Sequence, residues 1–218
     1  MRFAPLAALL ILAVSPAAGR AQEIPFFFVT MPAFIDLVGN SSGVPDAAGR
    51  FTVTVRDIGN YPVPDVRVVI DFSSCTDVAI CQDQADPGLT VTCQPGATTV
   101  SARTGANGVA TFDLMGHGRV PGGAGGPGLN CGRVYVESFM VGSLTVAVFD
   151  RAGGDGVHAV DMAAFLQDWG AGAYVGRADL NHDGLFNAAD FAVWLRRWGL
   201  GSSVGGCGSL PGGGGVCP

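Results

Sequence analysis

The chain has 218 residues, of which 48% are hydrophobic, 14% are charged and 34 are glycine. This composition favours short strands and many turns over a helical bundle, and the length allows one medium domain plus a small one. All twelve basic residues are arginine, the net charge is −6 and no basic cluster exceeds Arg196-Arg197. We therefore expect no nucleic-acid partner, and the lack of lysine excludes enzymes that need a P-loop or Schiff-base lysine.

The N-terminal residues have the three zones of a secretory signal peptide. Met1-Arg2 precede an apolar run from Leu6 to Val14, and small residues lead to Ala21. We predict a signal peptide over residues 1–21 and a secreted mature protein. A membrane anchor is the alternative, but the run is shorter than the ~20 apolar residues needed to span a bilayer. No later segment is apolar enough, so no membrane span is expected.

All six cysteines follow this segment, and an even number in a secreted chain predicts disulfides. Zinc is the competing interpretation, but no C-x-x-C pair occurs. The connectivity stays open among fifteen pairings. Loop closure favours near neighbours, which are Cys75–Cys81, Cys93–Cys131 and Cys207–Cys217.

The middle of the chain has the pattern of an all-β protein. Apolar and polar residues alternate over residues 51–56 and 66–72, which predicts half-buried strands. Further strands are expected at residues 89–93, 98–102, 108–114, 133–138 and 143–149. Short strands at this spacing predict a β-sandwich over residues 22–149.

Residues 55–66 and 104–112 resemble the bacterial immunoglobulin-like domains of invasin-type surface proteins, and the resemblance covers residues 45 to 150. It implies an immunoglobulin-like fold and makes adhesion an alternative function. The Gly-rich stretch 116–132 is expected to be a surface loop, with a binding loop as the alternative. No catalytic set of residues is found, so we predict that the chain is not an enzyme.

An internal repeat with a period of 29 residues follows. Residues 150–170 align without a gap on residues 179–199, which matches Asp150 with Asp179 and Asp161 with Asp190. The alignment also pairs Phe165 with Trp194, Leu166 with Leu195 and Trp169 with Trp198.

The second copy contains a twelve-residue calcium-loop pattern. Oxygen-bearing side chains occupy positions one, three, five, nine and twelve, and Gly184 occupies position six. Calcium prefers 6–8 oxygen ligands, and such a loop turns alternate side chains inward. We predict Ca²⁺ as the cofactor, with a polar turn that caps a helix as the alternative. The predicted ligands are Asp179, Asn181, Asp183, Leu185 through its carbonyl, Asn187 and Asp190.

The first copy keeps only the ends of this pattern, Asp150 and Asp161. Ala152 and Gly154 replace the third and fifth ligands, and Asp155 stands where glycine is expected. Calcium binding there is therefore expected to be weak or absent, unless Asp155 or His158 supplies a ligand.

An amphipathic helix is predicted after each loop, ending at Gly170 and Gly199. The apolar stripes are expected to form the mutual core of the two helices, and a sugar-binding platform is the alternative. Their members are Met162, Phe165, Leu166 and Trp169 in the first helix and Phe191, Trp194, Leu195 and Trp198 in the second.

Two loop–helix units with aspartate at position twelve resemble the dockerin module, which binds cohesin domains in bacterial multi-enzyme assemblies. The resemblance covers residues 150 to 200 and implies a cohesin-like or cell-surface protein partner and a possible association with polysaccharides. In cellulosomal dockerins, positions ten and eleven often carry hydroxyl residues that contact cohesin. Here they are Ala159-Val160 and Ala188-Ala189.

The expected fold class is mainly β: an immunoglobulin-like β-sandwich over residues 22–149, then a small all-α dockerin-like module over 150–200 and a Gly-rich tail over 201–218. The expected function is calcium-dependent protein–protein interaction outside the cell or at its surface. The alternative is a cell-surface adhesin that binds through the immunoglobulin-like domain.

Overall fold

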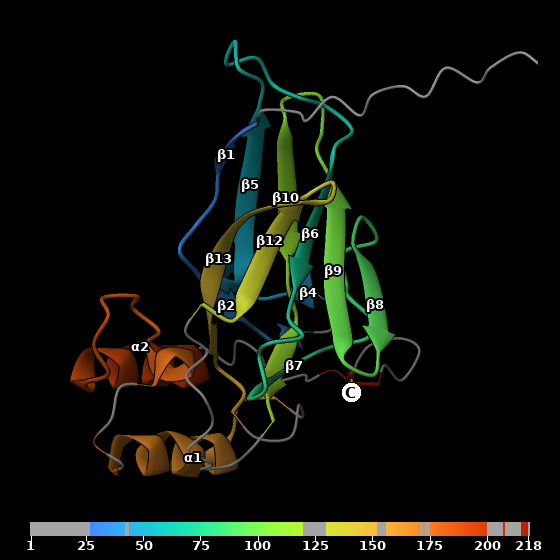
Figure 1. Ribbon diagram of the computed structural model, residues 1–218. Coiled ribbons are helices and arrows are strands. Elements are labelled where there is room, and N and C mark those ends of the chain that lie inside the picture. Colours follow the sequence, from blue (N-terminus) through green and yellow to red (C-terminus); the bar gives the residue numbers. More distant parts are fainter. Residues whose placement is uncertain are drawn as a thin grey trace, which may run out of the picture.

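The computed structural model describes residues 27–41, 44–119, 130–151, 156–170, 172, 175–199, 207 and 215–217. The predicted signal peptide, residues 1–21, lies outside them. The described residues are mainly β, with 41% strand and two α-helices. Two sheets face each other, one in front of the other in the view of Figure 1, and both helices lie near one end of them.

The smaller sheet has three antiparallel strands in the order β1-β5-β10. Its strands are β1 (Phe28–Thr30), β5 (Arg50–Arg56) and β10 (Val109–Asp113). The central strand β5 alternates as predicted, because Val53 and Val55 are buried while Arg50 and Thr52 are exposed.

The larger sheet has six strands in the order β2-β13-β12-β6-β9-β8. Its edge strand β2 pairs in parallel with β13, and the other pairs are antiparallel. The strands are β2 (Phe34–Leu37), β13 (Phe139–Val148), β12 (Gly132–Val136), β6 (Arg67–Asp71), β9 (Ala97–Arg103) and β8 (Thr90–Gln94).

Short elements complete the β part. Strand β11 (Gly116–Gly118) pairs with β7 (Val78–Ile80), and β3 (Asn40–Ser41) pairs with β4 (Val44–Pro45). The 3-10 turns are η1 (Ala47–Gly49) and η2 (Gly176–Ala178). Strand β11 corrects the expectation of a surface loop over 116–132, since its three residues are buried; residues 120–129 lie outside the described part.

The inward side chains of the three-stranded sheet and of the six-stranded sheet share one hydrophobic core. The alternation of apolar and polar residues predicted the strands at 51–56 and 66–72, and the apolar residues of that alternation lie in this core. The seven strands expected between residues 51 and 149 are all present, within a few residues at their ends. Strands β1, β2, β3, β4, β7 and β11 were not predicted.

The two helices, α1 (Ala159–Gly170) and α2 (Ala188–Gly199), start and end 29 residues apart, so the predicted repeat is kept in their bounds. Each is twelve residues long. In the part of the chain that the structure describes, no helix is long and apolar enough to cross a membrane.

The predicted fold class, a β-sandwich followed by a separate all-α module, is wrong. The protein is mainly β with two helices, and these bury their apolar residues against strands. Phe165 and Trp194 share a core with Phe149 and Ala147 at the end of β13, and the Trp194 indole donates a hydrogen bond of 3.0 Å to the Phe149 carbonyl. Two helices of this length bury little apolar surface on their own, so they use the β part as well.

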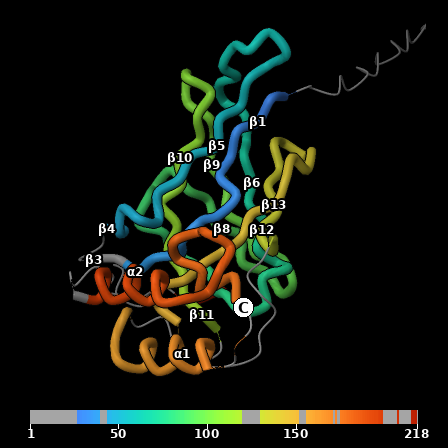
Figure 2. The backbone as a smooth tube through the Cα atoms, turned by 90° about the vertical axis from the view of Figure 1, so that its left-hand side faces the viewer, coloured from blue at the N-terminus to red at the C-terminus, as the bar shows by residue number. Residues whose placement is uncertain are grey.

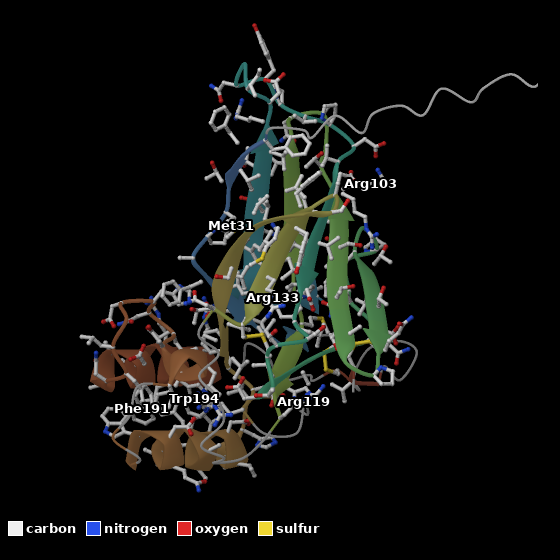
Figure 3. All side chains as sticks on the ribbon, in the orientation of Figure 1. Met31, Arg103, Arg119, Arg133, Phe191 and Trp194 are labelled. Carbon is white, nitrogen blue, oxygen red and sulfur yellow. A yellow bond between two sulfur atoms is a disulfide. The ribbon has the colours of Figure 1, made fainter. Side chains whose placement is uncertain are left out.

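Figure 3 shows Phe191 and Trp194 in the space between α1 and α2. Their rings contact Phe165 on the other helix at centroid distances of 5.4 and 6.1 Å. Figure 2 shows the helix pair at the end of the molecule where β11 lies. The small core is therefore enclosed by the two helices on one side and by strands on the other.

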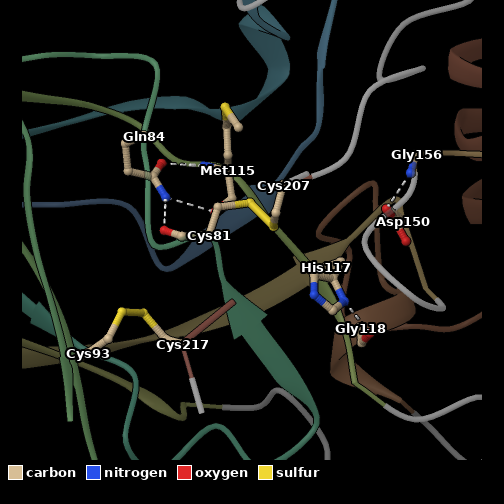
Figure 4. The surroundings of a disulfide bond; sticks show 10 residues. All are labelled: Cys81, Gln84, Cys93, Met115, His117, Gly118, Asp150, Gly156, Cys207 and Cys217. Atoms are coloured by element: carbon tan, nitrogen blue, oxygen red, sulfur yellow. Dashed lines mark hydrogen bonds between the residues drawn. A yellow bond between two sulfur atoms is a disulfide. The ribbon is translucent and has the colours of Figure 1, made fainter. Parts of the chain in front are cut away.

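The pairing that loop closure favoured is also wrong. The three disulfides join Cys75 to Cys131, Cys81 to Cys207 and Cys93 to Cys217. They span 56, 126 and 124 residues. Figure 4 shows the second and the third of them. Each doubling of a loop adds only about 0.6 kcal/mol to its closure cost, so the contacts of the fold decide the partners.

The C-terminal residues are held against the β part rather than closed on themselves. Residue Val216 forms a β-bridge with Cys81, and the Cys217 N–H donates to the Ile80 carbonyl at 2.9 Å. Two disulfides thus return the chain to the β part after the second helix, and both helices lie inside these covalent loops.

Candidate metal loops and the helix surface

The carboxylate of Asp190 closes the second loop. Its side chain is 0% exposed; Oδ1 accepts the Leu180 N–H at 2.9 Å and Oδ2 accepts the Asn187 N–H at 2.8 Å. It therefore joins positions two and nine of the loop to position twelve. Asn187 in turn accepts the Ala189 N–H at 2.8 Å and caps the first turn of α2.

Asp179 organises the other end of the loop. Its carboxylate is also 0% exposed, and it accepts the Asp183 N–H at 3.1 Å and the Gly184 N–H at 2.9 Å. Gly184 has a φ of 79°, the left-handed conformation that the sharp turn at position six requires.

The remaining predicted ligands lie nearer the surface. Asn181 and Asp183 are exposed, and the Asn181 amide donates to Asp183 Oδ2 at 2.9 Å. Asp183 Oδ1 accepts the Leu185 N–H at 2.8 Å. The structure thus brings the predicted set into one loop, with its two end carboxylates buried and its middle side chains facing out.

The first loop repeats part of this pattern. Asp161 accepts the Arg151 N–H at 2.6 Å and the His158 N–H at 2.8 Å, again from positions two and nine. Asp150 is buried and accepts the Gly156 N–H at 2.8 Å, as Figure 4 shows. Ala152, Gly154 and Asp155 lie outside the described residues.

A buried guanidinium distinguishes the first loop from the second. Arg151 stands where the second copy has Leu180, and it forms an ion pair with Asp168 and lies 5.2 Å from the centre of the Phe165 ring. Burial and the nearby Arg177 lower the pKa of Arg151 to about 9, against the charges of Asp161 and Asp77.

Arg151 belongs to a buried ionic cluster that the sequence did not reveal. Arg177 Nη2 lies 3.1 Å from Asp168 Oδ1, and Arg177 Nη1 lies 4.0 Å from Asp77 Oδ2 next to β7. The cluster connects α1 to the β part. Its members are spread over 101 residues, from 77 to 177, without a local motif, so no sequence pattern could have indicated it.

The two loops differ in how well they suit calcium. Within the described ranges, no three His, Cys, Asp or Glu side chains gather into a group that could hold a metal ion. Calcium also accepts amide and carbonyl oxygens, and a carboxylate has about four lone-pair sites, so N–H bonds orient it without excluding a cation. The donors of the second loop fit calcium in their chemistry. The first loop offers fewer donors and holds the Arg151 cation.

In each predicted apolar stripe one residue is buried, one is partly buried and two are exposed. Phe165 and Trp194 belong to the core, whereas Leu166, Trp169, Leu195 and Trp198 are 47%, 39%, 39% and 37% exposed. These four residues, which we call the helix patch, stand at the same two positions of both repeats. The predicted mutual core is thus present in part: Phe165 and Trp169 of α1 contact Phe191 of α2, at 5.4 and 6.0 Å between ring centroids, but the stripes are not wholly buried.

Burial on α1 extends beyond the predicted apolar stripe. Ala164 and Asp168 do not belong to that stripe, but both are buried. Arg197 is half-buried and forms an ion pair with Asp46 at 3.1 Å, while Arg196 is exposed. Arg196 is thus the charged residue of α2 that is available beside the helix patch.

No protein-family model, curated protein sequence or solved structure matches the chain.

Proposed function

We propose that this protein is a secreted, non-catalytic calcium-binding protein that binds another protein through the dockerin-like repeat over residues 150–200. The observation that carries the proposal is the helix patch. Two leucines and two tryptophans are exposed at matching repeat positions, and tryptophan is enriched at protein interfaces.

The second loop supports the calcium component of this proposal. Asp179 and Asp190 are buried 11 positions apart at its two ends, and the other oxygen donors of the pattern lie between them. We expect this loop to take one calcium ion. The ion would neutralise part of the carboxylate charge and fix the start of α2.

The disulfides support an oxidising compartment, and hence secretion. The partner we favour is a cohesin-like or other cell-surface protein with an apolar surface and acidic residues to meet Arg196. A link to polysaccharide-degrading assemblies follows from the dockerin resemblance alone.

A binding experiment tests this function. The full chain is immobilised and exposed to the proteins secreted by its native organism, with calcium or with a chelator. We expect one specific partner to be retained only with calcium, and to be lost in a variant carrying Trp169→Ser and Trp198→Ser.

The matched control replaces exposed apolar residues of the β part, Ile58→Ser with Tyr61→Ser, which are 75% and 71% exposed. This control should retain the partner. Retention that survives both chelation and loss of the two tryptophans would overturn the proposal. Loss with the control alone would point to binding through the β part.

A further inference from the structure

The second loop is attached to the edge of the larger sheet by a residue that is not a predicted ligand. His182, at loop position four, places Nε2 3.0 Å from Asp36 Oδ1 on β2. Its ring also stacks on Phe34 of β2, with centroids 5.1 Å apart and an angle of 13° between the planes. We call these three residues the β2 clamp.

The clamp fixes the part of the loop that carries two predicted ligands. His182 lies between Asn181 and Asp183, and its φ of 61° places it in the left-handed region. Residues other than glycine hold that conformation only where their surroundings determine it. The contacts with Asp36 and Phe34 provide those surroundings.

The other side of the clamp is a well-supported strand. Phe34 and Asp36 pair with Thr145 and Ala147 of β13, and the Asp36 side chain is 12% exposed. Nearby, Trp194 and Arg197 attach α2 to the β part through the Phe149 carbonyl and Asp46. The loop is therefore held against a strand that is part of the six-stranded sheet.

We infer that His182 is a positioning residue whose contacts with β2 hold Asn181 and Asp183 in the geometry that binds calcium. The β part then sets the calcium affinity of the second loop. This inference rests on the calcium site proposed above. Because coupling is reciprocal, calcium bound in the loop strengthens the attachment of the loop to β2.

The test is a calcium titration of the full chain by isothermal calorimetry. His182→Asn removes the ring but keeps a residue type that tolerates positive φ, and Phe34→Leu removes the stacking partner. We expect each change to weaken calcium binding by about 10-fold, the lower end of the effect of residues that orient metal ligands.

A double-mutant cycle separates two effects on the calcium affinity, that of the His182–Asp36 hydrogen bond and that of the Asp36 charge. Asp36→Ala alone removes both its hydrogen bond and its charge, and in the His182→Asn background it removes only the charge. We expect a smaller loss of affinity in that background. The matched control is His158→Asn at position nine of the first loop, which should leave the affinity unchanged.

The outcomes separate the two proposals. If the wild type binds no calcium, the proposed calcium site fails. If it binds but both His182→Asn and Phe34→Leu bind equally tightly, the clamp is overturned while the site stands. Circular dichroism of each variant without calcium checks folding. A loss of affinity at an unchanged melting temperature of the calcium-free protein supports the positioning role.

Discussion

At the scale of single residues, the most unusual feature is the amount of buried charge next to the first loop. Asp77, Arg151, Asp168 and Arg177 are all nearly inaccessible to solvent. Removing one partner of a buried pair leaves an uncompensated charge, which is costly, whereas exposed pairs contribute little. These four side chains should therefore matter far more to stability than the surface ion pairs.

Asp168→Ala tests this expectation, because Asp168 neutralises both Arg151 and Arg177. We expect the free energy of unfolding to fall by about 3–5 kcal/mol in urea denaturation with the disulfides intact. The control is Asp65→Asn, which keeps a residue type that tolerates the φ of 58° at this position. The Asp65 side chain is 82% exposed in its pair with Arg103, so its loss should cost at most about 1 kcal/mol. Equal losses in the two variants would contradict the expectation.

Asp77 gives a prediction for pH. Burial raises the pKa of its carboxyl above the usual 3.8, against the attraction of Arg177. The folded protein then binds this proton more tightly than the unfolded chain, so the contribution of Asp77 to stability falls as pH rises from 3.8 through the raised pKa.

Asp77→Asn removes this titration. The free energy of unfolding of the wild type minus that of Asp77→Asn should decrease from acidic to neutral pH. Urea denaturation of both proteins at several pH values measures the difference. A difference that grows with pH would contradict the predicted direction.

The contrast between the loops predicts the stoichiometry of calcium. The first loop holds the Arg151 guanidinium, so one ion per chain should bind, and Asp190→Ala should abolish binding because it removes the carboxylate that closes the second loop. Asp161→Ala, the same change in the first loop, should leave the titration at one ion. Calorimetry that finds two equal ions in the wild type would contradict this prediction.

At the scale of elements, periodicity predicted what is local and missed what depends on distant partners. The 29-residue repeat predicted both helices, since the apolar stripe and the terminal glycine of each helix lie within one copy of the repeat. The loop register was also predictable, because Asp161 and Asp190 bond to their own loops. Which residues of each stripe are buried depends on Val38, Ala147 and Phe149, and no pattern within the helices carries that information.

Trp194 is the clearest case of such dependence. It is fully buried between α1 and the end of β13, while Trp198, one turn later, is 37% exposed. Trp194→Ala should lower the free energy of unfolding by about 3–5 kcal/mol, because it leaves a cavity and an unsatisfied Phe149 carbonyl. Trp198→Ala should cost clearly less in the same thermal or urea denaturation. A larger loss of unfolding free energy for Trp198→Ala than for Trp194→Ala would contradict the assignment of Trp194 to the core.

At the scale of the whole molecule, the two parts that the sequence suggested are joined at three levels. A shared core contains Phe149 and Trp194, the ionic cluster links Asp77 to Arg177, and two disulfides return the chain to the β part. The sequence could predict that disulfides form but not their partners, since pairing depends on the folded positions of Cys81 and Cys93. A chain joined in this way should unfold as one unit.

The three tryptophans make this last expectation measurable, because all of them lie in the repeat. Their fluorescence reports the helices alone, whereas far-UV circular dichroism contains the signal of the strands as well as that of the helices. In urea, with disulfides intact and calcium present, both signals should change at the same midpoint, as two-state unfolding requires. Because the shared core ties the helices to β13, the coincidence should persist when the chelator lowers the midpoint of both signals together. A fluorescence transition that precedes loss of the β signal would show that the repeat is an independent unit after all.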